Sequence, residues 1–291
     1  MILSCGDALI DFVPVAAADG NEAVRPMVGG SCLNVAVGLA RLGAPAGFVG
    51  GISTDLFGRM IGEHACASGV DLTYATRSDH QTTLAFVRMA AGESQYAFYD
   101  AGTASRAWAY QRGKIPFEAV AAVHIGSTTL VNERGAAETA AMIADARRSA
   151  TISFDPNCRP NLVKDKKAYL DRMSVFAGSA DVIRMSDVDF DYLYGEATYG
   201  DKAASLFAGG CGLFAITRGV KGPKRGIQRP ERSRSMHLRS KWSIVSAQAT
   251  AFRRRFYLRC TSWAGSTGPG LLTPARMSFV MRFPSRAAVR R

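Results

Sequence analysis

Short apolar runs alternate with helical stretches over roughly the first 220 residues of the chain. The apolar runs end in glycine or polar residues, as strands do, and the stretches between them repeat apolar residues three and four positions apart, as amphipathic helices do. Strands that alternate with helices predict an α/β fold, in which helices cover both faces of a parallel sheet. We expect strands within residues 1–15, 46–53, 119–127, 151–157, 180–186 and 212–219, and helices within residues 27–43, 55–70, 133–149, 166–178, 187–195 and 201–210.

The first predicted helix follows a pair of glycines. Gly29 and Gly30 precede Ser31, which has the side chain of a helix N-cap, and Gly43 has the position of a helix stop. The pattern therefore predicts a glycine turn that leads from an extended segment into a helix capped by Ser31.

Residues 82–100 alternate between apolar and polar around a Gly-Glu turn, which predicts an exposed β-hairpin. The aromatic side chains of this hairpin include Phe86, Tyr96 and Phe98. Aromatic residues in such a place close over a small ligand as a lid, form a dimer interface, or fill a small core. The pattern leaves these three interpretations open.

The alternating pattern stops after Gly222. Residues 221–291 contain 17 of the 36 Lys and Arg residues but one of the 24 acidic residues, Glu231. The preceding part of the chain is therefore mildly acidic, and the net charge of +12 comes from the basic tail. Because this tail is rich in Arg, Ser and Pro and has no strand or helix period, we expect residues 223–291 to be poorly ordered.

Composition argues against several classes of protein. No apolar run approaches the roughly 18 residues that cross a bilayer, and the N-terminus lacks the basic start and cleavage site of a secretory signal. The six cysteines are scattered singly, and the four histidines have no metal-ligand spacing. We therefore expect a cytoplasmic protein with reduced thiols, without a disulfide framework or a zinc site.

Polar residues and glycines gather at the ends of the predicted strands, where ligands bind in α/β proteins. Asp11 follows an apolar run and either accepts hydrogen bonds from a sugar hydroxyl or caps a turn; we favour the first interpretation. Gly29 and Gly30 allow close approach to the backbone, and the Asn34 amide has the donors and the acceptor that a polyol needs. The alternative is a glycine loop before a helix.

Three later motifs fit a phosphate or a nucleotide. Asn157 and Arg159 lie just past a strand, where Arg159 either binds phosphate oxygens in a fork or is solvated in a surface turn. Ser186 and Asp189 lie three positions apart, so Asp189 can hold a magnesium-bound water, form a capping box with Ser186, or do both. The third motif, whose glycines let a nucleotide approach the backbone, comprises Thr217, Gly219 and Gly222.

In order and spacing, these motifs resemble the ribokinase-like, phosphofructokinase-B type sugar kinases. The stretch GGSCLNVAVGLARLGAPAGFVGGISTDLFGRMI is similar to the first glycine signature of that family, and GDALIDF, DPNCRP and TRGVKG match as well. The segments GDALIDFVP and DPNCRPNL are most similar to fructokinases and 2-keto-3-deoxygluconate kinases. The resemblance covers about residues 1–222, which we take as the kinase domain.

The resemblance implies a three-layer α/β/α domain with a mostly parallel central sheet and a small β lid that includes residues 82–100. It implies transfer of the γ-phosphoryl group of ATP to a sugar hydroxyl with Mg²⁺, and a possible homodimer through the lid. The sugar would be held by Asp11, Gly29, Gly30 and Asn34. Phosphate and magnesium would face Asn157, Arg159, Ser186 and Asp189, with Asp189 acting through water; the family usually has Asn and Glu at the last two sites. The nucleotide would lie along Thr217, Gly219 and Gly222.

One motif of that family is absent. A late Gly-Ala-Gly-Asp opens a helix, holds the phosphates with its backbone amides and supplies the aspartate that takes the proton of the sugar hydroxyl. This chain has no such motif. When Trp242–Tyr257 is read one base out of frame, with codons chosen where degeneracy allows, it gives VDSVGAGDSFQAAFL, and Ala247–Thr250 give the Gly-Ala-Gly-Asp itself.

We therefore infer a frameshift just after Gly222, either natural or introduced in sequencing, which leaves Thr250 where the base is expected. The predicted function is an ATP-dependent kinase of fructose or a related keto-sugar with a damaged C-terminus. One rival is a catalytically inactive sugar-binding protein. A weaker rival is a nucleic-acid binder that acts through the basic tail, where aromatic residues are sparse.

Overall fold

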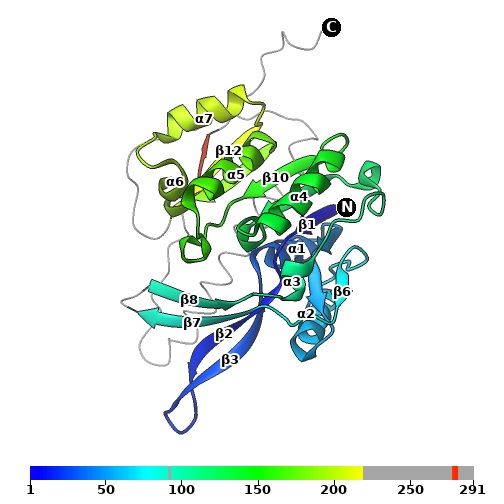
Figure 1. Ribbon diagram of the computed structural model, residues 1–291, viewed down its shortest axis with the longest axis vertical. Helices are drawn as coiled ribbons and strands as arrows, with labels where there is room; N and C mark the ends of the chain where they lie inside the picture. Colours follow the sequence, from blue (N-terminus) through cyan, green and yellow to red (C-terminus); the bar gives the residue numbers. More distant parts are fainter. Residues whose placement is uncertain (91–92, 219–276, 281–291) are drawn as a thin grey trace.

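The computed structural model of the protein describes residues 1–90, 93–218 and 277–280. The strands of its central sheet are β1 (Ile2–Cys5), β4 (Ala46–Val49), β9 (Ala122–Gly126), β10 (Thr151–Asp155), β11 (Val182–Ser186), β12 (Leu213–Thr217) and β13 (Met277–Val280). They lie in the order β13-β12-β11-β10-β9-β1-β4, and every neighbouring pair is parallel except β12 with β13 (Figure 1). The mostly parallel sheet predicted from the sequence is confirmed.

Seven α-helices surround this sheet in the described residues. They are α1 (Ser31–Arg41), α2 (Leu56–Ala67), α3 (Ala104–Ala107), α4 (Glu133–Ala146), α5 (Lys166–Gly178), α6 (Asp187–Tyr194) and α7 (Tyr199–Ala208). Three short 3-10 helices connect other elements: η1 (Phe117–Ala119), η2 (Ser127–Leu130) and η3 (Pro160–Leu162). The six helices predicted from the sequence all form.

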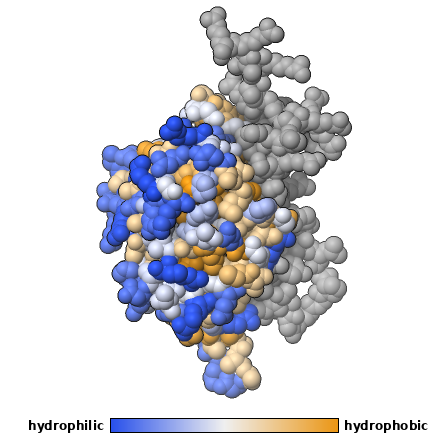
Figure 2. All heavy atoms as spheres, turned by 90° about the vertical axis from the view of Figure 1, so that its right-hand side faces the viewer, coloured by the Kyte–Doolittle hydropathy of each residue, from blue (hydrophilic) through white to orange (hydrophobic). Residues whose placement is uncertain are grey.

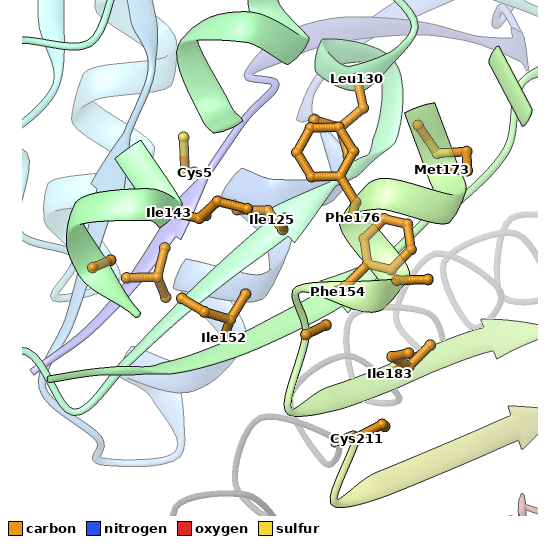
Figure 3. Close-up of a cluster of buried hydrophobic side chains, with 14 of the residues drawn as sticks. Cys5, Ile125, Leu130, Ile143, Ile152, Phe154, Met173, Phe176, Ile183 and Cys211 are labelled. Atoms are coloured by element: carbon orange, nitrogen blue, oxygen red, sulfur yellow. The ribbon is translucent and has the colours of Figure 1, made fainter. Parts of the chain in front are cut away.

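Alternate residues of the strands point to opposite faces of the sheet, and different helices cover the two faces. Helices α4 to α7 pack on one face, where their apolar side chains interdigitate with those of β9 to β12 (Figure 3). Helix α1 packs on the other face, through Val35 and Leu39 against Ile2 and Ala46. The fold is therefore the expected three-layer α/β/α arrangement.

A second sheet projects from the body as a lid (Figure 1). Its strands are β2 (Leu9–Ala16), β3 (Glu22–Gly29), β7 (Leu84–Ala90) and β8 (Glu93–Tyr99), in the order β3-β2-β7-β8. The predicted hairpin is β7 with β8, and the start of the chain supplies the other half of the lid. A small separate sheet pairs β5 (Gly51–Ser53) with β6 (Thr76–Ser78).

Two of the predicted strands are each divided into two. The prediction of one strand over residues 1–15 is wrong, because the chain leaves β1 at Gly6 and enters the lid at β2. Gly6 has φ +152°, and a Cβ there would lie 2.4 Å from Cys32 Sγ. Residues 46–53 divide at Gly50, where a Cβ would lie 2.5 Å from Gly6 O. The continuous apolar character concealed these turns, and both depend on close contacts that only glycine allows.

The region expected to lack a period contains one described strand, β13, which pairs with β12. The rest of residues 223–291 lies outside the described residues.

Hydrophilic and hydrophobic residues are mixed over the face shown in Figure 2. Within the described part of the chain, no helix has the length and apolar character that crossing a membrane requires.

Candidate functional site

Asp11 lies on β2 at the base of the lid, and only 7% of the residue is exposed. Its carboxylate faces the backbone at the end of β3, where a Cβ added to Gly29 would lie 2.3 Å from Asp11 Oδ2. Glycine therefore leaves the room that this carboxylate occupies. The structure brings these two predicted sugar residues into contact.

Gly30 has φ +103° and is the N-cap of α1, so the prediction of Ser31 as the N-cap is wrong. A Cβ on Gly30 would lie 2.5 Å from the carbonyl oxygen of Asp7, which explains why glycine is needed at this turn. The cap comes from a distant residue, because Asp7 Oδ1 accepts a hydrogen bond from Cys32 N at 3.0 Å. Asn34 follows in the first turn of α1, and its backbone N donates to Gly30 O at 2.9 Å.

Two of the three predicted lid aromatics lie on the same face of the lid as Asp11. Asp11 and Phe98 both pair with Ala85 on β7, and Tyr96 is two residues from Phe98 on β8. Side chains of directly paired residues lie on one face of a sheet, and so do those two apart along a strand. Asp11, Tyr96 and Phe98 therefore form one polar and aromatic surface.

The third aromatic, Phe86, lies on the opposite face of the lid. Phe86 pairs with Phe12, and their rings stack with centroids 4.7 Å apart. The edge of Phe57 on α2 packs against Phe12 at 5.6 Å. Phe86 thus packs with Phe12 on the lid face opposite Asp11, and the structure does not bring it to the predicted sugar residues.

The loop after β10 contacts the lid at Tyr96. The Arg159 guanidinium lies 5.9 Å from the centroid of the Tyr96 ring, and Asn161 Nδ2 donates to Tyr96 O at 3.1 Å. Asn157 in the same loop has φ +38°, and its backbone N donates to Asp155 Oδ1 at 3.1 Å. The Asp11 face of the lid and the predicted phosphate residues therefore belong to one region of the molecule.

A buried ion pair joins the ends of three strands beside this loop. Arg184 Nη1 on β11 lies 2.7 Å from Asp155 Oδ2 on β10, and the two side chains are 7% and 5% exposed. Arg184 Nη2 also donates to Thr217 Oγ1 on β12 at 2.5 Å. Because breaking a buried ion pair leaves a charge without compensation, this pair fixes the strand ends relative to one another.

Ser186 and Asp189 form the capping box that one interpretation of the sequence predicted. Ser186 Oγ accepts from Asp189 N at 3.0 Å, and Asp189 Oδ2 accepts from Ser186 N at 3.2 Å. Asp189 Oδ1 accepts from Cys158 N at 2.8 Å, which ties α6 to the loop after β10. Burial, and then the negative charge of Asp155, raise the pKa of the Asp189 carboxyl.

Comparison with known proteins identifies the family. Residues 1–223 match the pfkB family carbohydrate kinases. The chain belongs to this family. Among its curated relatives, a fructokinase of Rhizobium leguminosarum bv. trifolii is 34% identical over 76% of this chain and 68% of that protein. Fructokinase-1 of Oryza sativa subsp. japonica is 32% identical over 77% of this chain and 72% of that protein.

Solved structures of pfkB-type kinases have the same fold. The fructokinase of Xylella fastidiosa superimposes with a TM-score of 0.68 and 29% identity, covering 75% of this chain and 69% of that one. A second structure of the Xylella enzyme contains bound ATP and matches with the same TM-score. This chain is thus a carbohydrate kinase by family, with a ribokinase-like fold.

Three residues that the sequence analysis assigned to positions of this kinase site lie outside the described residues. They are Gly219, Gly222 and Thr250. Their predicted roles, at the nucleotide and in place of the catalytic base, stay predictions.

The role predicted for Asp189 at a magnesium-bound water stays a prediction. Both carboxylate oxygens already accept hydrogen bonds, and the residue is 7% exposed. In the structure this carboxylate caps α6. No group of three or more His, Cys, Asp or Glu residues able to hold a metal occurs within residues 1–90, 93–218 and 277–280.

Sequence reasoning did not single out three buried polar residues at the ends of the central strands: Asp7, Ser127 and Arg184. Arg184 carried a signal, since a charged residue interrupts an otherwise apolar strand. Asp7 carried no signal, because its role as the cap of α1 depends on Cys32, 25 positions away. Ser127, directly after β9, has φ +65°, and nothing in a polar turn after a strand indicates a positive φ.

Proposed function

We propose that this chain derives from an ATP-dependent kinase of fructose or a related keto-sugar. With its present C-terminal sequence, the chain would bind the sugar but transfer the phosphoryl group poorly. The observation that carries the sugar site is the buried Asp11 carboxylate against Gly29, on the same lid face as Tyr96 and Phe98. Fructose as the substrate is supported by the names of the relatives, which are fructokinases in bacteria and plants.

A buried carboxylate suits a sugar hydroxyl, because a hydrogen bond to a charged group contributes about 1.5–3 kcal/mol. Gly30 and Asn34 begin the helix next to Asp11, where an amide side chain can donate to and accept from further hydroxyls. An aromatic lid face excludes water and packs on the carbon face of a sugar. These residues together support a sugar pocket between the lid and the start of α1.

ATP would be the phosphoryl donor, with Mg²⁺ neutralising charge on its phosphates when bound. The residues of this chain proposed to face the phosphates are Asn157 and Arg159, and those proposed to line the nucleotide are Thr217, Gly219 and Gly222. Arg159 has the fork geometry that binds phosphate oxygens. Its position against Tyr96 supports a place between phosphate and lid.

Phosphoryl transfer is proposed to be impaired because the Gly-Ala-Gly-Asp motif is absent and Thr250 occupies the expected place of the base. A threonine hydroxyl does not take a proton at neutral pH, and loss of a general base costs about 10²–10⁴-fold in rate. The frameshift also accounts for the basic character of residues 223–291, so we propose no nucleic-acid function for them.

Isothermal titration of the purified, mass-verified chain with fructose, followed by a coupled ADP assay, tests the proposal. We expect binding without appreciable turnover. Asp11→Asn should weaken fructose binding about 10–100-fold, from the loss of charge-assisted hydrogen bonds. Asp19→Asn, at an exposed turn of the same lid, is the matched control and should leave binding unchanged.

Absence of binding heat would exclude the sugar site, whereas rapid ADP production would contradict the impairment. Sequencing the DNA across codons 218–230 addresses the origin of the tail. An added or missing base there, which would put the Gly-Ala-Gly-Asp of codons 247–250 in frame, would mean that the true product is an intact kinase. Confirmation of the present frame would mean that the gene encodes the damaged one.

A further inference from the structure

Two non-glycine residues in the described part of the chain have positive φ, and they are in contact. Ser127 has φ +65° directly after β9, and Asn157 has φ +38° after β10. Asn157 Nδ2 donates to Ser127 Oγ at 3.2 Å, and Ser127 N donates to Pro156 O at 3.3 Å. A residue in a strained conformation costs on the order of 1–3 kcal/mol and persists when its surroundings hold it there.

The group that holds Ser127 is Asp7, a buried carboxylate just after β1 that is 4% exposed. Asp7 Oδ2 accepts hydrogen bonds from Ser127 Oγ at 3.0 Å and from Thr128 Oγ1 at 3.5 Å. The other oxygen, Oδ1, accepts from Cys32 N at 3.0 Å in the first turn of α1. A negative charge at a helix N-terminus is also favourable. Through these hydrogen bonds, one carboxylate joins β1, α1 and η2.

The same contacts continue to the lid. Thr128 O, next to Ser127 in η2, accepts from Arg106 Nη1 at 2.9 Å. The Arg106 guanidinium also forms an ion pair with Asp100, the residue directly after β8. Asp7 is therefore linked through η2 to the point where the chain leaves the lid.

We propose that Asp7 is a positioning residue for sugar binding, acting through the hydroxyl of Ser127 without touching the sugar. It holds the start of α1, which carries Gly30 and Asn34, the loop that carries Asn157, and the exit of the lid in one arrangement. The inference rests on the proposed function, because it assumes that sugar binds beside these elements.

If Asp7 and Ser127 only stabilised the fold, substitutions at them would lower stability and fructose affinity together. The test therefore measures these two quantities separately. Ser127→Ala removes the hydroxyl and keeps a side chain that is strained at φ +65°, whereas Ser127→Gly removes both the hydroxyl and the strain. We expect Ser127→Gly to melt about 2–4 °C above Ser127→Ala. Both variants should weaken the Kd for fructose equally, by about tenfold.

Asp7→Asn tests the carboxylate itself and should also weaken the Kd for fructose about tenfold. Asp181→Asn is its matched control, because Asp181 Oδ2 accepts from Ile152 N at 2.8 Å at the start of β10 and β11, whereas Asp7 lies past the end of β1. The control should lower the melting temperature without changing the Kd.

If Ser127→Gly regains fructose affinity as well as stability relative to Ser127→Ala, the proposal is overturned. An unchanged Kd for fructose in Asp7→Asn would also overturn it. If Asp7→Asn fails to fold, the two Ser127 variants decide the outcome by themselves. Fructose binding by the unaltered chain together with unchanged variants would overturn this inference alone. No fructose binding by the unaltered chain would overturn the proposed function and this inference together.

Discussion

His124 should make the folded protein sensitive to acid. The side chain lies on β9 with no exposed surface, and Nδ1 is 3.2 Å from Ser153 Oγ. Burial, and then the positive charge of Arg184, lower the pKa of His124 to about 3. Histidine in an unfolded chain has a pKa of about 6.5. Below that pH the unfolded chain therefore binds a proton that the folded protein does not.

The sign of the effect follows from this difference in pKa. The free energy of unfolding should fall as the pH drops from about 6.5 towards about 3, and His124 should have no effect above pH 6.5. Each pH unit within this window costs about 1.4 kcal/mol, so the loss reaches about 2 kcal/mol at pH 5.

Urea denaturation of the unaltered chain and of His124→Asn at pH 7, 6 and 5 measures this loss. Asparagine keeps a polar partner for Ser153 and does not titrate. Between pH 7 and pH 5, the free energy of unfolding should therefore fall by about 2 kcal/mol less in the variant than in the unaltered chain. His80→Asn, at an exposed histidine, should behave like the unaltered chain. Parallel curves for the unaltered chain and His124→Asn would refute the reasoning.

Three further changes test other parts of the structure. Arg184→Met should lower the free energy of unfolding by about 3–5 kcal/mol in urea denaturation. The double variant Asp155→Asn with Arg184→Met should lose less free energy of unfolding than the sum of the losses in the two single variants. Gly30→Ala places a Cβ 2.5 Å from a backbone oxygen at φ +103°; we expect a lower melting temperature and loss of fructose binding by calorimetry. Phe98→Ala should weaken the Kd for fructose, whereas Phe86→Ala, on the other lid face, should change stability by about 1–2 kcal/mol and leave that Kd unchanged.

Much of the fold could be predicted from the pattern of the chain, because parallel strands buried on both faces are short apolar runs between helical stretches. The predicted helices form, and the capping box of Ser186 with Asp189 is present as a local motif of four residues. The turns at Gly6 and Gly50 could not be predicted, because the apolar character continues through them. Their glycines are needed for contacts with residues that are distant in sequence.

The sequence by itself determined the α/β class, the family motifs and the place where the pattern ends, since each of these is a property of neighbouring residues. Only the tertiary structure decided which residues meet. It placed Tyr96 and Phe98 on the face of Asp11 and Phe86 on the other, and it joined Asp7 to Ser127 across 120 positions. Such contacts depend on strand register and on how helices pack on the sheet, and a local pattern of residues does not contain that information.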